Sequence, residues 1–212
     1  MENEETGSAG LLLNDLLQQA GMASLGPEQI KQFDIYLSLF VRWNAKINLS
    51  SVRDPGEILA RHFVESVTCA CALPDNISTL LDFGSGGGLP GIPIALCRPE
   101  IAVTLADSQG KKAAFLQEAV RVLGIPTKVF AGRGESLSEQ FDCVVLRAVD
   151  KMADAVHSAA QLVRVGGCLA LMTASVDAPR FQSAVGEGYK WGEELPLPGS
   201  TGRICLCGVR VV

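Results

Sequence analysis

The sequence predicts an α/β fold: a Rossmann-like, doubly wound sheet that is mostly parallel, ends in an antiparallel hairpin and follows a helical extension. The first observation is a glycine-rich turn between a strand-like and a helix-like segment, within residues 80–97. The second is the alternation of apolar runs with amphipathic segments over residues 101–173, which is typical of a parallel sheet with helices on both faces. The third is a C-terminal tail whose two strand-like runs lie too close together for a crossover helix.

The first 76 residues are expected to form a helical extension that packs on a main domain at residues 77–212. A short helix is predicted over residues 9–20. A longer helix should begin at Pro27, because proline suits the first helical position and apolar residues then recur at helical spacing. A third should run from Pro55 to about residue 73.

The main domain is expected to alternate strands with helices. The expected strands cover residues 80–82, 101–107, 127–131, 141–147 and 168–173, and the expected helices cover residues 92–97, 111–123 and 152–165. In the tail, residues 189–195 and 203–211 are strand-like and are joined by a short segment rich in proline and glycine. A parallel pair needs a dozen or more connecting residues, so these two strands should pair antiparallel.

Composition sets broad limits. A chain of 212 residues with 48% hydrophobic and 19% charged residues is long enough, and apolar enough, for a globular α/β domain with an extension. No apolar run approaches the roughly 20 residues that span a bilayer, and the acidic start is unlike a signal peptide. We therefore expect a cytoplasmic protein. The net charge of −5 argues against nucleic-acid binding over the whole surface but allows a local basic patch.

The seven cysteines are expected to be reduced and buried, because several lie in apolar strand-like runs. Cys69 and Cys71, like Cys205 and Cys207, are separated by one residue, whereas zinc sites usually use a two-residue spacing. No metal site is expected.

The glycine-rich turn is the strongest candidate for a binding site. Five glycines follow Asp82 within nine positions, and glycine lets backbone N–H groups approach a ligand beside a helix N-terminus. Asp107 ends the next expected strand, where a carboxylate can accept hydrogen bonds from a ribose diol. An adenosine-type cofactor is therefore implied, with a helix cap as the alternative role of Asp107.

The turn has two interpretations. Residues 86–91 match the dinucleotide fingerprint G-x-G-x-x-G, which would indicate a nicotinamide-dependent oxidoreductase. However, Asp82 beside the turn would repel a pyrophosphate and could instead bind the amino group of a methionine moiety. Together with Pro90 inside the motif and the antiparallel tail, this favours a methyltransferase.

Further candidates lie at other expected strand ends. Gly134 and Glu135 follow the third strand, and Arg147 closes the fourth. Glu135 could be an ordinary surface acid, and Arg147 could pair with Asp142 or Asp150, but an arginine that closes an apolar strand at the binding edge favours a functional role. Several basic residues could jointly form a phosphate-binding rim: Arg53, Arg61, His62, Lys111 and Lys112. Each alone would be a surface charge, and packing or capping is the ordinary role of the histidine.

From about residue 28 to its end, the chain resembles the bacterial RsmG (GidB) methyltransferases. The motifs that carry the resemblance are Asn44–Asp54, Arg61–Ser66, Asp82–Pro93, Asp107–Ser108 with Lys111–Lys112, and Arg147–Ala148. The resemblance implies a class I S-adenosylmethionine-dependent methyltransferase that modifies N7 of one guanine in 16S ribosomal RNA of the small subunit. The expected partner is thus 16S rRNA or the 30S subunit, and the expected state is a monomer without membrane contact.

The resemblance also assigns site residues. The expected cofactor contacts are Gly84, Ser85, Gly86, Leu89, Asp107, Gly134, Glu135 and Arg147. Arg147 is expected to position the reactants without proton transfer, because guanine N7 carries an unprotonated lone pair and needs no general base. A non-catalytic ribosome-binding or assembly factor with the same fold is the alternative.

The sequence departs from the family pattern at four positions. Ser50 stands in place of a threonine, Leu146 in place of a serine and Gly134 in place of a bulkier residue. Thr173 stands where a lysine is expected, which bears on RNA binding rather than on the cofactor.

Overall fold

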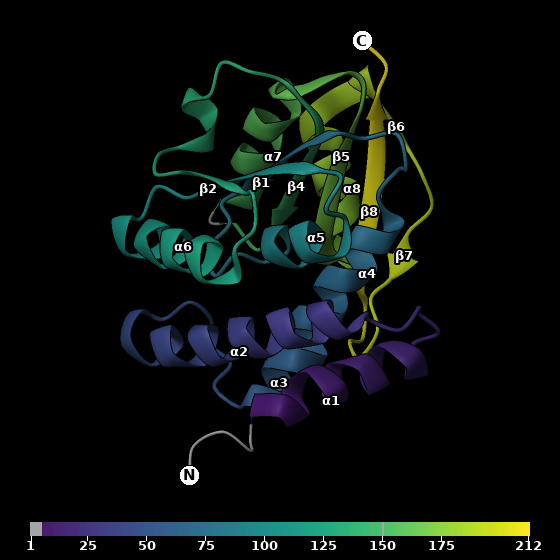
Figure 1. The fold of residues 1–212 in the computed structure, drawn as a ribbon. Helices are drawn as coiled ribbons and strands as arrows, with labels where there is room; N and C mark the ends of the chain where they lie inside the picture. The colour runs from purple at the N-terminus through teal and green to yellow at the C-terminus, as the bar shows by residue number, and fades with distance from the viewer. Residues whose placement is uncertain (1–5, 150) are drawn as a thin grey trace.

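Eight strands form one sheet with helices on both faces (Figure 1). The structure, a computed structural model, describes residues 6–149 and 151–212. The strands are β1 (Thr79–Phe83), β2 (Ala102–Ala106), β3 (Lys128–Phe130), β4 (Phe141–Arg147), β5 (Val163–Ala174), β6 (Tyr189–Trp191), β7 (Leu195–Pro196) and β8 (Arg203–Arg210). Their order is β3-β2-β1-β4-β5-β8-β6, and β7 also pairs with β8. Strands β1 to β5 are parallel, whereas β8 is antiparallel to β5, β6 and β7, so the predicted antiparallel tail is confirmed.

The helices are α1 (Thr6–Gln19), α2 (Pro27–Ile47), α3 (Pro55–Ile58), α4 (Val64–Ala72), α5 (Gly91–Cys97), α6 (Gly110–Leu123), α7 (Met152–Gln161) and α8 (Ala178–Val185). A π-helical turn, η1 (Leu59–Phe63), joins α3 to α4, and short 3₁₀ turns are η2 (Gly134–Ser136), η3 (Ser175–Asp177) and η4 (Gly186–Gly188). In the described part of the chain, no helix is both long and apolar enough to cross a bilayer.

Helices cover both faces of the sheet, and consecutive strand residues point to opposite faces, so each strand contributes side chains to both cores. Leu80 and Val145 face α4, α5 and α6, whereas Leu81 and Val144 face α7 and α8. The continuous apolar run of β4 predicted a strand covered on both sides, and every residue of that strand is buried.

Helices α1 and α2 form a further layer beyond α5 and α6 (Figure 1). The α2 residues Phe33, Tyr36 and Phe40 are fully buried in the same core as the sheet residues. The Tyr36 ring stacks on Phe63 at 4.8 Å between centroids, and the edge of Phe40 meets Phe115 of α6 at 6.1 Å. Helix α2 therefore shares the core of the main domain. Burial of each such side chain stabilises the fold by roughly 1.5–3 kcal/mol.

Several elements differ from the sequence prediction. The single strand predicted over residues 189–195 is divided into β6 and β7. The helix predicted over residues 152–165 ends at Gln161, and β5 begins at Val163, where it pairs with Phe141 of β4. The pairing register of the two strands then shifts before Cys168 pairs with Cys143. Helix α8 was not predicted. The third expected helix begins as expected, with Asp54 Oδ1 accepting from Glu57 N at 2.8 Å, but the π turn interrupts it.

The seven cysteines are free, as expected, but they are not all buried. Cys71 is exposed, and Cys97 and Cys207 are half-buried. Cys71 lies in the last turn of α4, directly after the buried residues Cys69 and Ala70, and faces solvent. The apolar sequence around it therefore did not indicate its exposure.

Candidate functional site

A cavity of about 500 Å³ lies at the carboxyl ends of β1 to β4. Its walls bring together five of the predicted site residues, from four separate segments: Gly84, Asp107, Lys112, Gly134 and Glu135. The volume lies within the range of about 300–1,000 Å³ that is typical of small-molecule sites. The parallel strands therefore gather these residues at one edge, as the sequence pattern predicted.

Two glycines let neighbouring segments of the cavity wall pack closely, because a side chain at either position would collide with its neighbour. Gly84 has a φ of +75°, and a Cβ atom there would lie 2.9 Å from Cγ2 of Val149 on the opposite wall. At Gly134 a Cβ atom would lie 2.5 Å from the ring of Phe83. The ring of Phe83 thus fills the space beside Gly134, which accounts for the small residue at this position.

The backbone of the turn is fixed by its own hydrogen bonds. The amides of Gly84 and Ser85 both donate to Ala106 O at 2.9 Å, and Ser85 Oγ donates to Asp82 O at 2.9 Å. Ser85, Gly86 and Leu89 are not among the residues that line the cavity. Their predicted contact with a cofactor stays a prediction, and in the structure they shape the turn.

Asp107 links the turn to the next helix. Its Oδ2 accepts from Gly86 N at 2.9 Å, and its Oδ1 accepts from Gln109 N at 2.8 Å, just before α6 begins. Gln109 is itself the N-cap residue of α6, and no side-chain capping hydrogen bond is formed there, so the structure gives Asp107 a place at the cavity but not the alternative helix-capping role. Each carboxylate oxygen keeps a second lone pair, which is available to a hydroxyl group in the cavity.

Asp82 lies under the turn and does not line the cavity. Its side chain is 1% exposed and accepts a hydrogen bond from Gly91 N, the first amide of α5, at 3.0 Å. Burial raises the pKa of Asp82 to about 7, against the opposing effect of the Gly91 hydrogen bond. The proposed contact of Asp82 with a methionine amino group gains no support from this position.

Arg147 is buried at the end of β4, and its guanidinium reaches the helical extension. It forms an ion pair with Glu65 Oε2 at 2.8 Å, and it donates to His62 Nδ1 at 2.8 Å and to Arg61 O at 3.2 Å. The alternative pair with Asp142 is wrong, because Asp142 pairs with Arg164 Nε at 2.6 Å; Asp150 lies outside the described residues. Burial lowers the pKa of Arg147 to about 10, so it stays charged at neutral pH.

The contact of Arg147 with a cofactor stays a prediction. Its side chain is not among those that line the cavity, whereas the next two residues, Ala148 and Val149, do line it. Arg203 of β8 approaches the same carboxylate, with Nε 3.3 Å from Glu65 Oε1. Burial raises the pKa of Glu65, while both arginines act to lower it.

His62 is held between two partners. Arginine only donates hydrogen bonds, so we assign Nδ1 as the acceptor from Arg147 and Nε2–H as the donor to Ser50 Oγ at 2.7 Å. Burial, followed by the charge of Arg147, lowers the pKa of His62 to about 3. The ring is therefore neutral at pH 7, and Ser50 supplies its second hydrogen bond.

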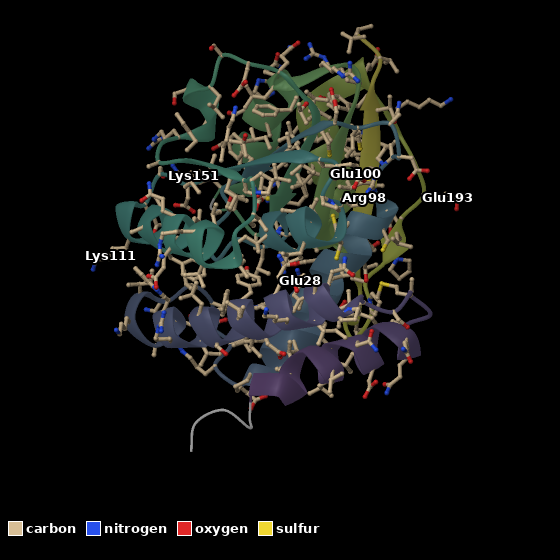
Figure 2. All side chains as sticks on the ribbon, viewed as in Figure 1. Glu28, Arg98, Glu100, Lys111, Lys151 and Glu193 are labelled. Carbon is tan, nitrogen blue, oxygen red and sulfur yellow. The ribbon has the colours of Figure 1, made fainter. Side chains whose placement is uncertain are left out.

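The remaining basic candidates are spread over the surface. Arg53 donates to Asn44 O and Asn48 Oδ1, and Arg61 pairs with Glu57 at 2.8 Å. Lys111 projects outward from α6 (Figure 2), whereas Lys112 reaches the cavity. The structure therefore places one of the five predicted basic residues at the cavity wall, and their role in RNA binding stays a prediction.

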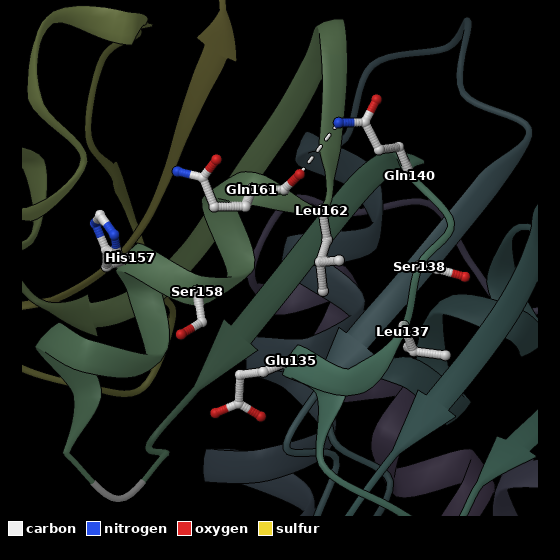
Figure 3. A pocket seen from close by; sticks show the side chains of 8 residues that line it. All are labelled: Glu135, Leu137, Ser138, Gln140, His157, Ser158, Gln161 and Leu162. Carbon is white, nitrogen blue, oxygen red and sulfur yellow. Dashed lines mark hydrogen bonds between the residues drawn. The ribbon is translucent and has the colours of Figure 1, made fainter.

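A second cavity of about 700 Å³ lies beside the first, between η2 and α7 (Figure 3). Glu135 lines both cavities, and Gln140 Nε2 donates to Gln161 O at 3.2 Å across the second one. The segment between β3 and β4 contains only the η2 turn where a doubly wound fold usually has a helix.

Sequence reasoning missed three residues of this region. Tyr36 donates from its buried hydroxyl to Gly87 O at 2.6 Å, Glu65 binds Arg147, and Lys151 lines the cavity from the start of α7 with a φ of +52°. Glu65 offered a signal, because a carboxylate among the apolar residues of an amphipathic helix needs a buried partner. Tyr36 offered none beyond its place on the apolar face of α2.

Residues 29–183 match the family model described as rRNA small subunit methyltransferase G. A ribosomal RNA small subunit methyltransferase G of Roseiflexus castenholzii is 44% identical over 150 residues, which cover 68% of this chain and 64% of that relative. The namesake protein of Xanthomonas euvesicatoria is 40% identical over 180 residues, which cover 82% of this chain and 84% of that relative.

Solved structures share the fold at low sequence identity. The ribosomal protein L11 methylase of Lactobacillus delbrueckii superposes with a TM-score of 0.58 at 14% identity, over 70% of this chain and 77% of that one. The mitomycin 7-O-methyltransferase MmcR superposes with a TM-score of 0.63 at 12% identity, over 99% of this chain and 74% of that one. The predicted fold class is confirmed.

Proposed function

The chain belongs to the rRNA small subunit methyltransferase G family, and from that premise we propose that it transfers a methyl group from S-adenosylmethionine to N7 of a guanine in 16S ribosomal RNA. The observation that carries the proposal is the cavity at the ends of β1 to β4, which joins a bare glycine backbone to the carboxylate of Asp107. We further propose that residues 1–76 help to bind RNA and that residues 77–212 carry the reaction.

The cavity fits an adenosine-type cofactor. Asp107 has lone pairs free for ribose hydroxyl groups, because each of its oxygens accepts only one backbone hydrogen bond from the protein. Gly134 and Glu135 supply the adjoining wall from the segment after β3. A side chain at position 84 would meet Val149, so the close approach of the two walls depends on glycine there.

The position of Asp82 supports this cofactor over a dinucleotide. A pyrophosphate binds the free N–H groups at a helix N-terminus, but here Gly91 N already donates to the buried carboxyl group of Asp82. Asp82 therefore occupies the amide that a diphosphate would use. Asp82, which favoured a methyltransferase in the sequence, therefore also argues against an oxidoreductase in the structure.

The chemistry asks for positioning more than for proton transfer. S-adenosylmethionine supplies an electrophilic methyl group when it is bound, and guanine N7 offers a lone pair that is unprotonated at neutral pH. Holding the reacting atoms about 3–3.5 Å apart can lower the barrier by roughly 7–11 kcal/mol. The residues around the cavity need only bind, orient and exclude water.

The RNA surface is proposed from charge. Lys112, Arg133 and Lys151 line the cavity, and Arg53 and Arg61 lie on the extension. Binding that depends on several phosphate contacts weakens as salt rises, by about 0.7–0.9 in log affinity per contact for each tenfold increase. We place the reaction in the cytoplasm and propose that the chain acts as a monomer without a metal; no cluster of three metal-ligating side chains occurs among the described residues.

The test is mass mapping of 16S RNA from a strain that lacks this gene. The expected result is loss of one N7-methylguanosine, which returns when the gene is supplied again. A complete set of methylated guanines in the deletion strain would overturn the proposal. Purified protein that binds S-adenosylmethionine but methylates neither 16S RNA nor 30S particles would indicate the non-catalytic assembly factor, and binding of NAD(H) instead would indicate the oxidoreductase.

A further inference from the structure

We infer that Glu65 is a positioning residue: it holds Arg147 in place and, through Arg147, the wall of the cofactor cavity that Ala148 and Val149 form. The inference rests on the proposed function, because it concerns the same cavity. It gives the helical extension a part in the cofactor site that is separate from any part in binding RNA.

The link begins in the extension. Glu65 lies on α4 with its carboxyl group fully buried, and Oε2 is 2.8 Å from Arg147. The same guanidinium donates to His62 Nδ1 and to Arg61 O in the π turn. One arginine thus ties the end of β4 to three residues of the extension, and the planar guanidinium makes this geometry specific.

The link continues into the cavity along the backbone. Ala148 follows Arg147 with a φ of +49°, a left-handed conformation that costs energy for a residue other than glycine. Val149 follows and packs closely against Gly84 of the glycine turn. Both residues line the cavity, so a shift of Arg147 would move a wall that touches the turn.

The ion pair is poorly arranged for stability alone. Replacing a buried ion pair by apolar residues is often neutral or stabilising. Here the second cation, Arg203, stands 3.3 Å from Glu65 Oε1, yet Arg203 Nε and Glu65 Oε1 are buried without forming a hydrogen bond. A buried carboxylate that bonds Arg147 through one oxygen and leaves the other without a hydrogen bond is better explained by the geometry that it imposes on Arg147.

The experiment compares Glu65→Gln with Asp142→Asn. Asp142 lies on β4, the strand of Arg147, but at the opposite end of that strand. There it pairs with Arg164 at 2.6 Å and accepts a hydrogen bond from Ser78 N at 2.6 Å. Both variants remove a carboxylate that pairs with arginine, but Asp142 is remote from the cavity. Calorimetry with S-adenosylmethionine gives the Kd, and thermal unfolding gives the Tm.

We expect Glu65→Gln to raise the Kd for S-adenosylmethionine about tenfold, within the roughly 5–150-fold range of coupling between sites. Asp142→Asn should lower the Tm and leave the Kd within about twofold of the wild type. Glu65→Asp, which keeps the charge on a shorter arm, should recover part of the affinity. A normal Kd in folded Glu65→Gln protein would overturn the inference, whatever its Tm.

A second measurement covers the case in which Glu65→Gln does not fold. If Glu65 acts through Arg147, then Glu65→Asp combined with Arg147→Lys should bind no more weakly than Arg147→Lys alone. Additive losses would overturn the inference. Failure of the wild type to bind S-adenosylmethionine is a different outcome, which overturns the proposed function itself.

Discussion

Replacing Tyr36 by phenylalanine tests whether α2 supports the glycine turn. The Tyr36 hydroxyl donates to Gly87 O at 2.6 Å, and both groups are buried. Phenylalanine keeps the stacking on Phe63 but leaves the carbonyl without its donor, at a cost of about 1–3 kcal/mol. At about 2–4 °C per kcal/mol for a chain of this size, the Tm should fall by about 2–12 °C.

The matched control is Tyr189→Phe. The Tyr189 hydroxyl donates to Ala160 O at 2.8 Å in a buried contact on the other side of the sheet. Both variants should lose similar stability, but only Tyr36→Phe should weaken S-adenosylmethionine binding, by about fivefold if about 1 kcal/mol of the loss reaches the turn. Thermal unfolding and calorimetry measure the two effects. Equal Kd values in both variants would refute the reasoning.

Three further predictions follow from the site. Gly84→Val should abolish S-adenosylmethionine binding in calorimetry, because its side chain would meet Val149. Gly124 also has a positive φ but lies in open space, so Gly124→Val should cost stability only. Asp107→Asn should raise the Kd about tenfold by removing a charged acceptor for the ribose, and an unchanged Kd would leave Asp107 only its contacts with Gly86 N and Gln109 N. His62→Asn should make unfolding less sensitive to acid: the folded pKa is about 3, so the unfolded state binds more protons between about pH 6.5 and 3, and the wild type loses stability as pH falls through that window. Urea unfolding at several pH values measures this, and parallel curves for the two proteins would contradict it.

The sequence predicted best where local pattern and topology coincide. The run into the glycine turn and the acid at Asp107 are signals of the strand–turn–helix unit itself, and the parallel sheet then brings Asp107 beside Gly84. The end of α7 was misplaced because Val163 continues the helical spacing of Val156 and Ala159, while Val163 and Val165 also show the two-residue spacing of a strand. Pairing with β4 decided between the two, and pairing is not a local property.

The role of Arg147 could not be found in the same way. Its place at the end of a buried strand was predictable, but its partner Glu65 lies 82 positions earlier, in a helix of the extension. The candidates named from sequence, Asp142 and Asp150, were chosen for nearness along the chain. Asp82 shows the opposite case: its effect on ligand choice was predicted from charge, while its hydrogen bond to Gly91 depends on how the turn folds back over the strand.

The aromatic contact between α2 and α6 has a consequence for synthesis of the protein. Phe40 packs against Phe115, which the ribosome adds about 75 residues later, or about 4–15 s at a rate of about 5–20 residues per second. During that interval the rings of α2 have no finished surface to cover them. A truncated chain that begins at residue 77 would have the converse defect, an uncovered apolar face on α5 and α6, so its loss of methylation would be no measure of RNA binding. Helix α2 therefore reaches its final environment only after α6 has been made.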